Sequence, residues 1–300
     1  MKKESFKNKA KRHQLNFFSK ENQSTVKEKN GRAQDHWLNE KAAGEGKIFY
    51  PGYEVCIAAK DKLRGKKIIP EWFYDTLRSQ HIPFNFFIPL RAEKELAAKV
   101  FGRMLDIRIK SIEEIEIEFP PSNDNPLNDK TSFDAFVSYN NESGRKGMIG
   151  IEVKYTEGGY SPTKRERSEI GKSNALYYKK HEESKLFKNI DPKDLIKNRF
   201  RQIWRNHLLA YAYQRKNDYA EFKSVTIYPS GNTHFCEAIE EYKAFLTDAG
   251  KNTFKGITYE SFFDELAKCS QTQDQHNWIE YLRERYLISD CSNQLKKVSE

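Results

Sequence analysis

The spacing of apolar residues changes along the chain, and each change predicts a different element. Residues 92–109 place their apolar side chains at the three- and four-residue spacing of one helix face. Residues 114–119 then alternate glutamate with isoleucine or phenylalanine, which is the period-two pattern of a half-exposed strand. Two further strands are predicted at 132–139 (SFDAFVSY) and 147–155 (GMIGIEVKY), and the polar residues between them predict a hairpin turn.

The second half of the chain continues with the same two patterns. Residues 198–216 carry one apolar stripe and predict a helix, and residues 221–229 (EFKSVTIYP) predict a strand ended by proline. Residues from about 234 to 290 look helical, and the polar, basic residues 156–195 suggest a flexible or partly helical insertion. The order is helix, three strands, helix, strand and further helices. It predicts an α/β domain with a mixed sheet flanked by helices, and with helical extensions.

The N-terminal residues differ from the rest of the chain in charge. Residues 1–32 hold ten Lys and Arg against three Glu, whereas the remaining residues are nearly balanced. We predict a basic, flexible arm over residues 1–35, with a short helix near Leu15–Phe18, and a single domain over residues 36–300. A basic arm suits a polyanion such as nucleic acid, although a merely solvated terminus explains the charge equally well. Within the domain, residues from Pro70 to Leu77 suggest a helix that enters the core.

Composition excludes several classes of protein. Aromatic residues make up 13% of the chain, which is too many for a disordered sequence. No run of about 18 apolar residues predicts a membrane helix, and no apolar segment follows the basic N-terminus as in a secretory signal. The four cysteines are scattered without a metal-binding pair, which favours reduced thiols and a cytoplasmic protein.

The third predicted strand carries an unusual pair of polar residues. Glu152 and Lys154 are two residues apart, so alternation places both on one face while Ile151 and Val153 point toward the core. Asp134 lies on the preceding strand, and a hairpin would bring it toward Glu152. Lysine is rarely buried, and an acid beside it can share a metal ion and a substrate.

This combination suits the hydrolysis of a phosphodiester. Mg²⁺ prefers hard oxygen ligands and takes only one or two carboxylates from the protein. We therefore expect Asp134 and Glu152 to bind Mg²⁺, with the backbone carbonyl of Val153 as a further ligand and Mn²⁺ as a substitute ion. The metal lowers the pKa of bound water, and Lys154 adds a positive charge near the attacking water or the scissile phosphate.

A Glu-X-Lys tripeptide alone says little, because such tripeptides occur by chance in most proteins. An exposed, ion-paired strand face would explain it in an ordinary structural α/β protein. Asp134 on the preceding strand, the glycine-containing turn and the helix and strand that follow favour the catalytic interpretation instead.

The motifs in which these residues lie resemble a known superfamily. FDAFVSY followed by GMIGIEVKYTE resembles the PD-(D/E)XK nucleases, whose restriction-endonuclease-like core runs α-β-β-β-α-β. Their paired acids lie on the second and third core strands, with a lysine two residues after the second acid. A narrower similarity, to a bacterial family named as restriction endonucleases, rests on LRSQHIPFNFFIPL (77–90), IGIEVKYTE (149–157), RFRQIWRNHLLA (199–210) and WIEYLRERYL (278–287). The resemblance covers about residues 70–290.

The resemblance implies that Asp134, Glu152 and Lys154 are catalytic. The position before the first acid, often proline in the superfamily, is Phe133 here, and this departure removes no ligand. Related nucleases often use a glutamine on the helix after the third strand, which makes Gln202 a supporting catalytic candidate. Asn206 lies one turn further along the same helix.

Several basic residues are candidates for contact with nucleic acid. On the helix after the third strand these are Arg199, Arg201 and Arg205, which could reach phosphates or could be merely solvated. In the basic segment 161–181 they are Lys164, Arg165 and Arg167. Two other residues are expected elsewhere: Glu157 at the edge of the cleft, and His207 as a core histidine.

The predicted function is a Mg²⁺-dependent DNA endonuclease in restriction or phage defence. One alternative is a non-catalytic nucleic-acid-binding protein, and another is a nuclease that acts on RNA or on repair intermediates. Cleavage of both DNA strands commonly needs two active sites, which would favour a homodimer. No GxxxxGK[ST] motif is present, so nucleotide-driven translocation would require partner proteins of a defence system.

Overall fold

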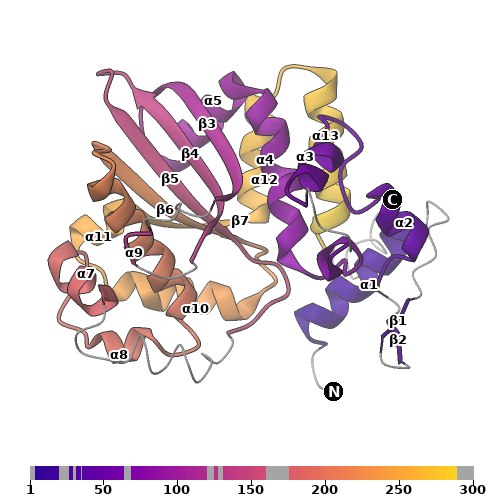
Figure 1. Ribbon diagram of the computed structural model, residues 1–300, viewed down its shortest axis with the longest axis horizontal. Helices are drawn as coiled ribbons and strands as arrows, with labels where there is room; N and C mark the ends of the chain where they lie inside the picture. The colour runs from indigo at the N-terminus through magenta and orange to yellow at the C-terminus, as the bar shows by residue number, and fades with distance from the viewer. Residues whose placement is uncertain are drawn as a thin grey trace, which may run out of the picture.

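The computed structural model describes residues 4–19, 27–29, 32–34, 36–63, 69–119, 125–127, 131–159 and 176–288, and only the backbone of 27–29 and 32–34. One twisted sheet lies between two groups of helices (Figure 1). No helix in these ranges has the length and apolarity needed to cross a membrane.

The main sheet has five strands in the spatial order β3-β4-β5-β6-β7. The first three are antiparallel neighbours, and β6 and β7 continue the sheet in parallel with β5. A two-stranded ribbon, β1 with β2, lies apart from it. The strand bounds are β1 Lys27–Lys29, β2 Arg32–Gln34, β3 Ile109–Phe119, β4 Phe133–Asn141, β5 Lys146–Val153, β6 Glu221–Tyr228 and β7 Phe254–Thr258.

The helices form two groups along the chain. Those before the sheet are α1 Phe6–Ser19, α2 Glu40–Glu45, α3 Val55–Asp61, the 3₁₀ turns η1 Glu71–Phe73 and η2 Ser79–His81, α4 Ile82–Ala92 and α5 Lys94–Leu105. Those after β5 are α7 Leu176–Ser184, α8 Pro192–Leu195, α9 Arg201–Lys216, α10 Thr233–Ala244, α11 Asp248–Thr253, α12 Tyr259–Cys269 and α13 Gln273–Tyr286.

Each face of the sheet packs against its own apolar cluster. Strand residues such as Ala135 and Ile151 join the cluster that contains α4, α5, α12 and α13. Their neighbours Phe136 and Met148 point to the opposite face and join the cluster under α9 and α10. This alternation follows from the two-residue period of a strand. Because β4 and β5 are covered on both faces, polar side chains on them lie inside the protein.

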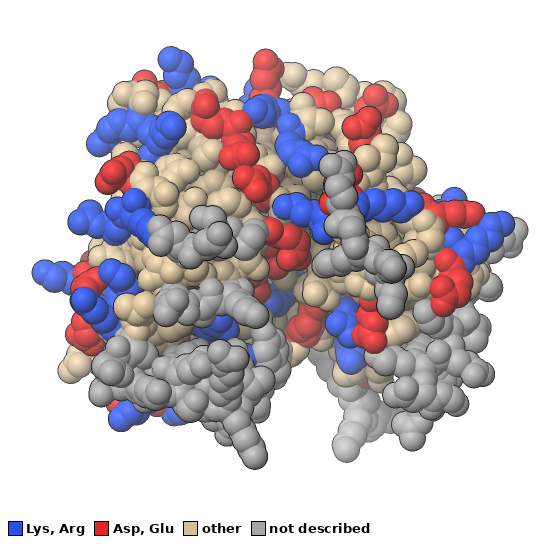
Figure 2. Space-filling model, in the orientation of Figure 1, with Lys and Arg blue, Asp and Glu red and all other residues tan. Residues whose placement is uncertain are grey.

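Charged side chains of both signs are interspersed over the face shown in Figure 2, with no large area of one sign among the described residues. This agrees with the nearly balanced charge of residues 33–300. Any local electrostatic field must therefore come from the arrangement of a few groups rather than from the total charge.

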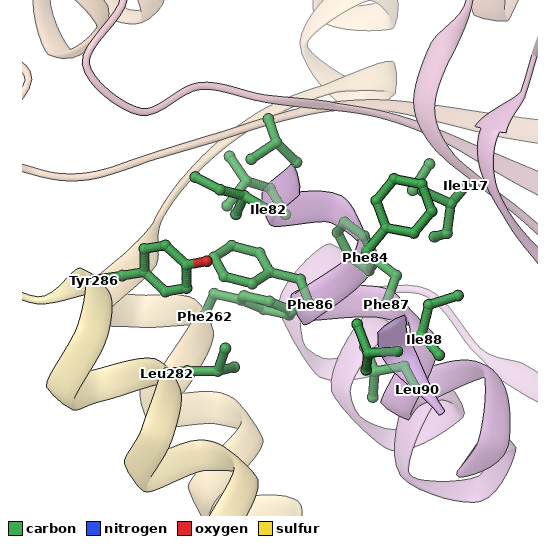
Figure 3. Packing of buried hydrophobic residues seen from close by; sticks show 14 of the residues in the cluster. Ile82, Phe84, Phe86, Phe87, Ile88, Leu90, Ile117, Phe262, Leu282 and Tyr286 are labelled. Carbon is green, nitrogen blue, oxygen red and sulfur yellow. The ribbon is translucent and has the colours of Figure 1, made fainter. Parts of the chain in front are cut away.

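Helix α4 lies at the centre of the larger cluster. Its residues from Ile82 to Leu90 are all buried, as expected for a helix that is apolar on every side. Phe86 lies between the rings of Phe262 on α12 and Tyr286 on α13, with centroids at 5.6 and 5.5 Å (Figure 3). The first core helix and the two C-terminal helices therefore form one packed unit behind the sheet.

The structure confirms the predicted fold class, a restriction-endonuclease-like α/β core with a mixed sheet flanked by helices. Helix α5, strands β3 to β5, helix α9 and strand β6 reproduce the order α-β-β-β-α-β. Three elements differ from the sequence expectation. Residues 70–77 form only the short turn η1 and not a longer helix. The stretch expected to be helical from 234 to 290 contains strand β7, whose five residues are too short to show a clear period.

The third difference lies within the expected flexible arm. Helix α1 spans Phe6–Ser19 and buries Ala10, Gln14 and Phe18 against the body of the protein. The Nε2 group of Gln14 donates to the hydroxyl of Tyr155 at 2.9 Å. The spacing of the three buried residues, four apart, is the helical signal that the high charge of this segment obscured.

Candidate active site

Strand pairing aligns three carboxylates across the sheet. The register pairs Ile117 with Ala135, and Ala135 with Ile151. One residue further along, Glu118 on β3, Asp134 on β4 and Glu152 on β5 therefore lie in one row. Asp134 and Glu152 point to the same face, as paired residues of adjacent strands do. Glu118 has a φ of 51°, which interrupts the alternation of β3, but its charge still acts on Asp134. The row lies near the end of β5, at its last residues.

The row faces α9. Asp134 alternates with Ala135, which joins the opposite cluster, and Glu152 shares its face with Met148, which packs under α9. Helix α9 supplies Asn206, whose Nδ2 group donates a hydrogen bond to Oε2 of Glu152. Asn206 is buried, with 5% of its surface exposed. The helix that the sequence predicted after the third strand thus contacts the second acid directly.

Lys154 and Glu152 form a buried ion pair. Nζ of Lys154 contacts Oε1 of Glu152, and the two side chains are only 7% and 8% exposed. Burial alone would lower the pKa of Lys154, but the charges of Glu152, Asp134 and Glu157 outweigh it and raise that pKa. Lys154 is therefore an ammonium ion at neutral pH, held in a largely dry site.

Asp134 is held by the backbone of the neighbouring strand. Its Oδ2 accepts a hydrogen bond from the amide of Val153 at 2.7 Å. Burial and the charge of Glu152 nevertheless raise the pKa of Asp134 well above its ordinary value, and Glu118 adds to the rise. Two carboxylates in a desolvated site repel each other, so the site favours the binding of a cation or a proton.

The donor set fits a hard divalent cation. Mg²⁺ takes one or two carboxylates and keeps several waters, and Asp134 with Glu152 supplies that number. The repulsion that raises the pKa of Asp134 would be relieved by such an ion. Within the described ranges, no three acidic, histidine or cysteine side chains converge into a closed metal cage. The two carboxylates therefore suit an ion that takes few ligands from the protein, as Mg²⁺ does.

The other sequence candidates fall in different places. Gln202 lies on α9 one turn before Asn206 and is half-buried. Arg199 is 33% exposed and forms ion pairs with Glu237 and Glu241 at 3.1 and 2.7 Å. The carbonyl of Val153 lies at the end of β5, beside the row of carboxylates.

Arg201 and Arg205 are more enclosed than surface phosphate contacts would be. Arg201 is only 1% exposed, so it is not the merely solvated residue that was one of its two expectations. Arg205 donates to the hydroxyls of Tyr177 and Thr131. Lys164, Arg165 and Arg167 lie outside the described residues.

Sequence reasoning did not identify two neighbours of the site. Glu118 is the last glutamate of the alternating strand, and its register with Asp134 could be found only once the pairing of β3 and β4 was known. Tyr259 begins α12, more than 100 residues from the motif, and its hydroxyl donates to the carbonyl of Lys154 at 2.6 Å. No local pattern links it to the site. His207, by contrast, is a buried core histidine as predicted.

An α-β-β-β-α-β core with one acid on its second strand, and a second acid and a lysine at the end of its third, is the arrangement found in a class of nucleases. A family model described as the PD-(D/E)XK nuclease superfamily matches residues 2–288. The chain belongs to this superfamily, and it is therefore a nuclease by family. Members of the superfamily generally use divalent metal ions. No curated protein and no solved structure matches this chain.

Proposed function

We propose that this nuclease is a Mg²⁺-dependent DNA endonuclease that acts in restriction or phage defence. The observation that supports it most strongly is the juxtaposition of Asp134, Glu152 and Lys154 at the end of β5, with the lysine buried against the second acid. Most lysine–glutamate pairs lie at the protein surface, where they contribute little to stability. The burial of this pair therefore suggests a role other than an ordinary surface salt bridge.

Asp134 and Glu152 are the proposed carboxylate ligands, with the carbonyl of Val153 as a third. When bound, a divalent ion would activate water and neutralise charge on the phosphate, and Mn²⁺ would substitute for Mg²⁺. Asn206 holds one oxygen of Glu152, which fixes the orientation of that carboxylate. Gln202, one turn away, is the proposed residue that orients the water or the phosphate.

The proposed role of Lys154 follows from its charge state. The neighbouring carboxylates raise its pKa, which favours the ammonium form and a role as a positive charge. A phosphodiester gains negative charge as it is attacked, and a fixed ammonium group stabilises that charge best where water is scarce. The low exposure of Lys154 supports this assignment.

Contacts with the DNA backbone are proposed for basic residues around the site. Lys164, Arg165 and Arg167 are the first candidates because they follow β5 by about ten residues. Arg199 and Arg205 are the candidates on and beside α9, and both would exchange their present partners for phosphate. Phosphate contacts of this kind release counterions, so binding should weaken as salt increases.

The wider biological setting is also a proposal. A homodimer would bring two active sites to the two DNA strands, and partner proteins of a defence system would supply any nucleotide-driven step. A cytoplasmic location follows from the same role. These proposals rest on the narrower resemblance to a bacterial family of restriction endonucleases.

The test is cleavage of supercoiled plasmid, single-stranded DNA and RNA by purified protein with Mg²⁺, Mn²⁺ or EDTA. Glu152→Gln and Lys154→Met remove the charges with little change in shape. Their matched controls are Glu221→Gln and Lys146→Met, at the opposite ends of β6 and β5 from the proposed site.

Metal-dependent cutting that is lost in Glu152→Gln and Lys154→Met but kept in both controls would support the proposal. Preference for RNA or for single strands would move the function toward RNA or repair. Binding without cutting under every metal condition would refute the catalytic assignment and favour a nucleic-acid-binding protein.

A further inference from the structure

Residues 154–157 follow the end of β5, and several other groups form hydrogen bonds with their backbone. Strand β5 ends at Val153, so Lys154 is the first residue beyond it. Its amide donates to the carbonyl of Ile227 at 2.8 Å. Its carbonyl accepts from the hydroxyl of Tyr259 at 2.6 Å. Both backbone groups of the proposed catalytic lysine are therefore fixed, one by β6 and one by a side chain from α12.

The next residues are fixed in the same way. The amide of Tyr155 donates to Oε2 of Glu157 at 2.8 Å, and the other oxygen of Glu157 accepts from the amide of Ser79 at 2.8 Å. Nδ2 of Asn232 donates to the carbonyls of Tyr155 and Glu157 at 2.8 and 2.9 Å. The Lys154 amide thus still pairs with β6, whereas side chains hold the Lys154 carbonyl, both backbone groups of Tyr155 and the Glu157 carbonyl.

Tyr259 is the member of this set that contacts Lys154 itself. Its ring is fully buried and stacks on Tyr155, with centroids 6.2 Å apart. It also meets the ring of Phe86 edge-on at 5.0 Å. A ring packed on several sides has few positions for its hydroxyl, so the oxygen that meets Lys154 is held rigidly.

We propose that Tyr259 is a positioning residue for Lys154, an inference that rests on the proposed nuclease function. The lysine side chain is long, so the position of its ammonium group depends on the position and orientation of the Lys154 backbone. A shift of about 1 Å in a reacting group can cost on the order of a hundredfold in rate. The Tyr259 hydroxyl prevents such a shift by holding the Lys154 carbonyl beyond the end of the strand.

The decisive variant is Tyr259→Phe, which removes the hydroxyl and keeps the ring. We expect kcat for DNA cleavage to fall about ten- to hundredfold, the range typical of residues that orient a functional group. KM should change little, because the substrate does not contact the buried ring.

The matched control is Tyr286→Phe. Tyr286 belongs to the same aromatic cluster, is equally buried, and its hydroxyl accepts from Asn85 at 2.8 Å. This variant loses a comparable buried hydrogen bond, one made to Asn85 and not to Lys154, and its kcat should stay within about twofold of the wild type. Melting temperatures of both variants report the common structural cost.

A double-mutant cycle separates positioning from stability. Lys154→Arg keeps the positive charge but moves it, and in that background Tyr259→Phe should lower kcat less than in the wild type, since the group that it positions is already displaced. An equal loss in both backgrounds, or an equal loss in Tyr286→Phe, would overturn the inference. If the wild type cuts and Tyr259→Phe cuts equally fast, the inference fails and the proposed function stands. If the wild type cuts nothing, the proposed function fails and this inference falls with it.

Discussion

Breaking the ion pair between Glu152 and Lys154 should strongly destabilise the metal-free protein. Both side chains are more than nine-tenths buried. Lys154→Met leaves Glu152 beside Asp134 with no cation between them. Glu152→Gln leaves the ammonium group of Lys154 with Asp134 as its remaining buried counterion. Each single change therefore leaves uncompensated charge, whereas the double variant Glu152→Gln/Lys154→Met removes both charges.

The expected losses follow from the cost of a buried unpaired charge. Breaking such a pair by removing one partner costs about 3–5 kcal/mol. Lys154→Met should lie at the upper end of that range, because two carboxylates then repel each other. Glu152→Gln should lie at the lower end, because Asp134 still favours the charged lysine. The double variant should lose less than Lys154→Met alone, so its loss should fall about 3 kcal/mol or more short of the sum.

Urea denaturation in EDTA measures these losses, with the emission of the buried residues Trp204 and Trp278 as the signal. Equal slopes of the unfolding curves would show that the four proteins expose the same surface. Additive losses in the double variant would refute the argument, because they would mean that the two groups do not interact. Losses below about 1 kcal/mol in both single variants would do the same, since that is the value of a solvated surface pair.

The remaining predictions concern one residue each. Asn206→Ala removes the donor that holds Glu152 and should weaken Mg²⁺-dependent cleavage about ten- to hundredfold, whereas Asn217→Ala, at the end of the same helix, should leave it unchanged in the same assay. Burial lowers the pKa of His207 to about 3, below its ordinary 6.5. The stability that neutral His207 contributes is therefore fully present above pH 6.5 and is lost as the pH falls from there toward 3. His207→Gln should flatten this part of the curve of unfolding free energy against pH, measured by denaturation. Phe18→Ala should cost about 3–5 kcal/mol in thermal or urea unfolding, because α1 packs on the body of the protein. The control Lys7→Ala changes an exposed residue and should alter stability by less than about 0.5 kcal/mol. Equally small effects of both variants would favour the flexible arm that the sequence predicted.

The fold was predictable from the sequence where the apolar period was long and regular. Helix α5, strands β3 to β5 and helix α9 follow from such patterns. Strand β7 was not predictable, because its five residues carry only two buried side chains, Phe254 and Ile257. Only a short helix near Leu15–Phe18 was predicted, and the full length of α1, Phe6–Ser19, was missed for a different reason. The helix is rich in lysine, arginine and asparagine, and one of its three buried residues is Gln14, so average polarity hid a narrow stripe that tertiary packing stabilises.

Some of the site residues could likewise be predicted from local patterns and others could not. Asp134, Glu152 and Lys154 could be placed together from strand alternation and one hairpin, because both rules are local. The choice between Gln202 and Asn206 could not be made in this way. One helical turn separates them, so both lie on the same face of α9, and spacing alone treats them alike. Their difference is a shift of about 6 Å along the helix axis.

The position of α9 along β5 and β6 decides which of the two residues reaches Glu152. Helix α9 packs on those strands through residues such as Ile203 and Leu208, whose buried positions fix its height above the sheet. At that height the amide of Asn206 meets Glu152. A glutamine in its place would carry one more methylene group and would overshoot the carboxylate. Asn206→Gln should therefore impair cleavage although it keeps the amide, and this outcome would show that the axial position of α9, and not the chemistry of the side chain alone, selects the residue that orients Glu152.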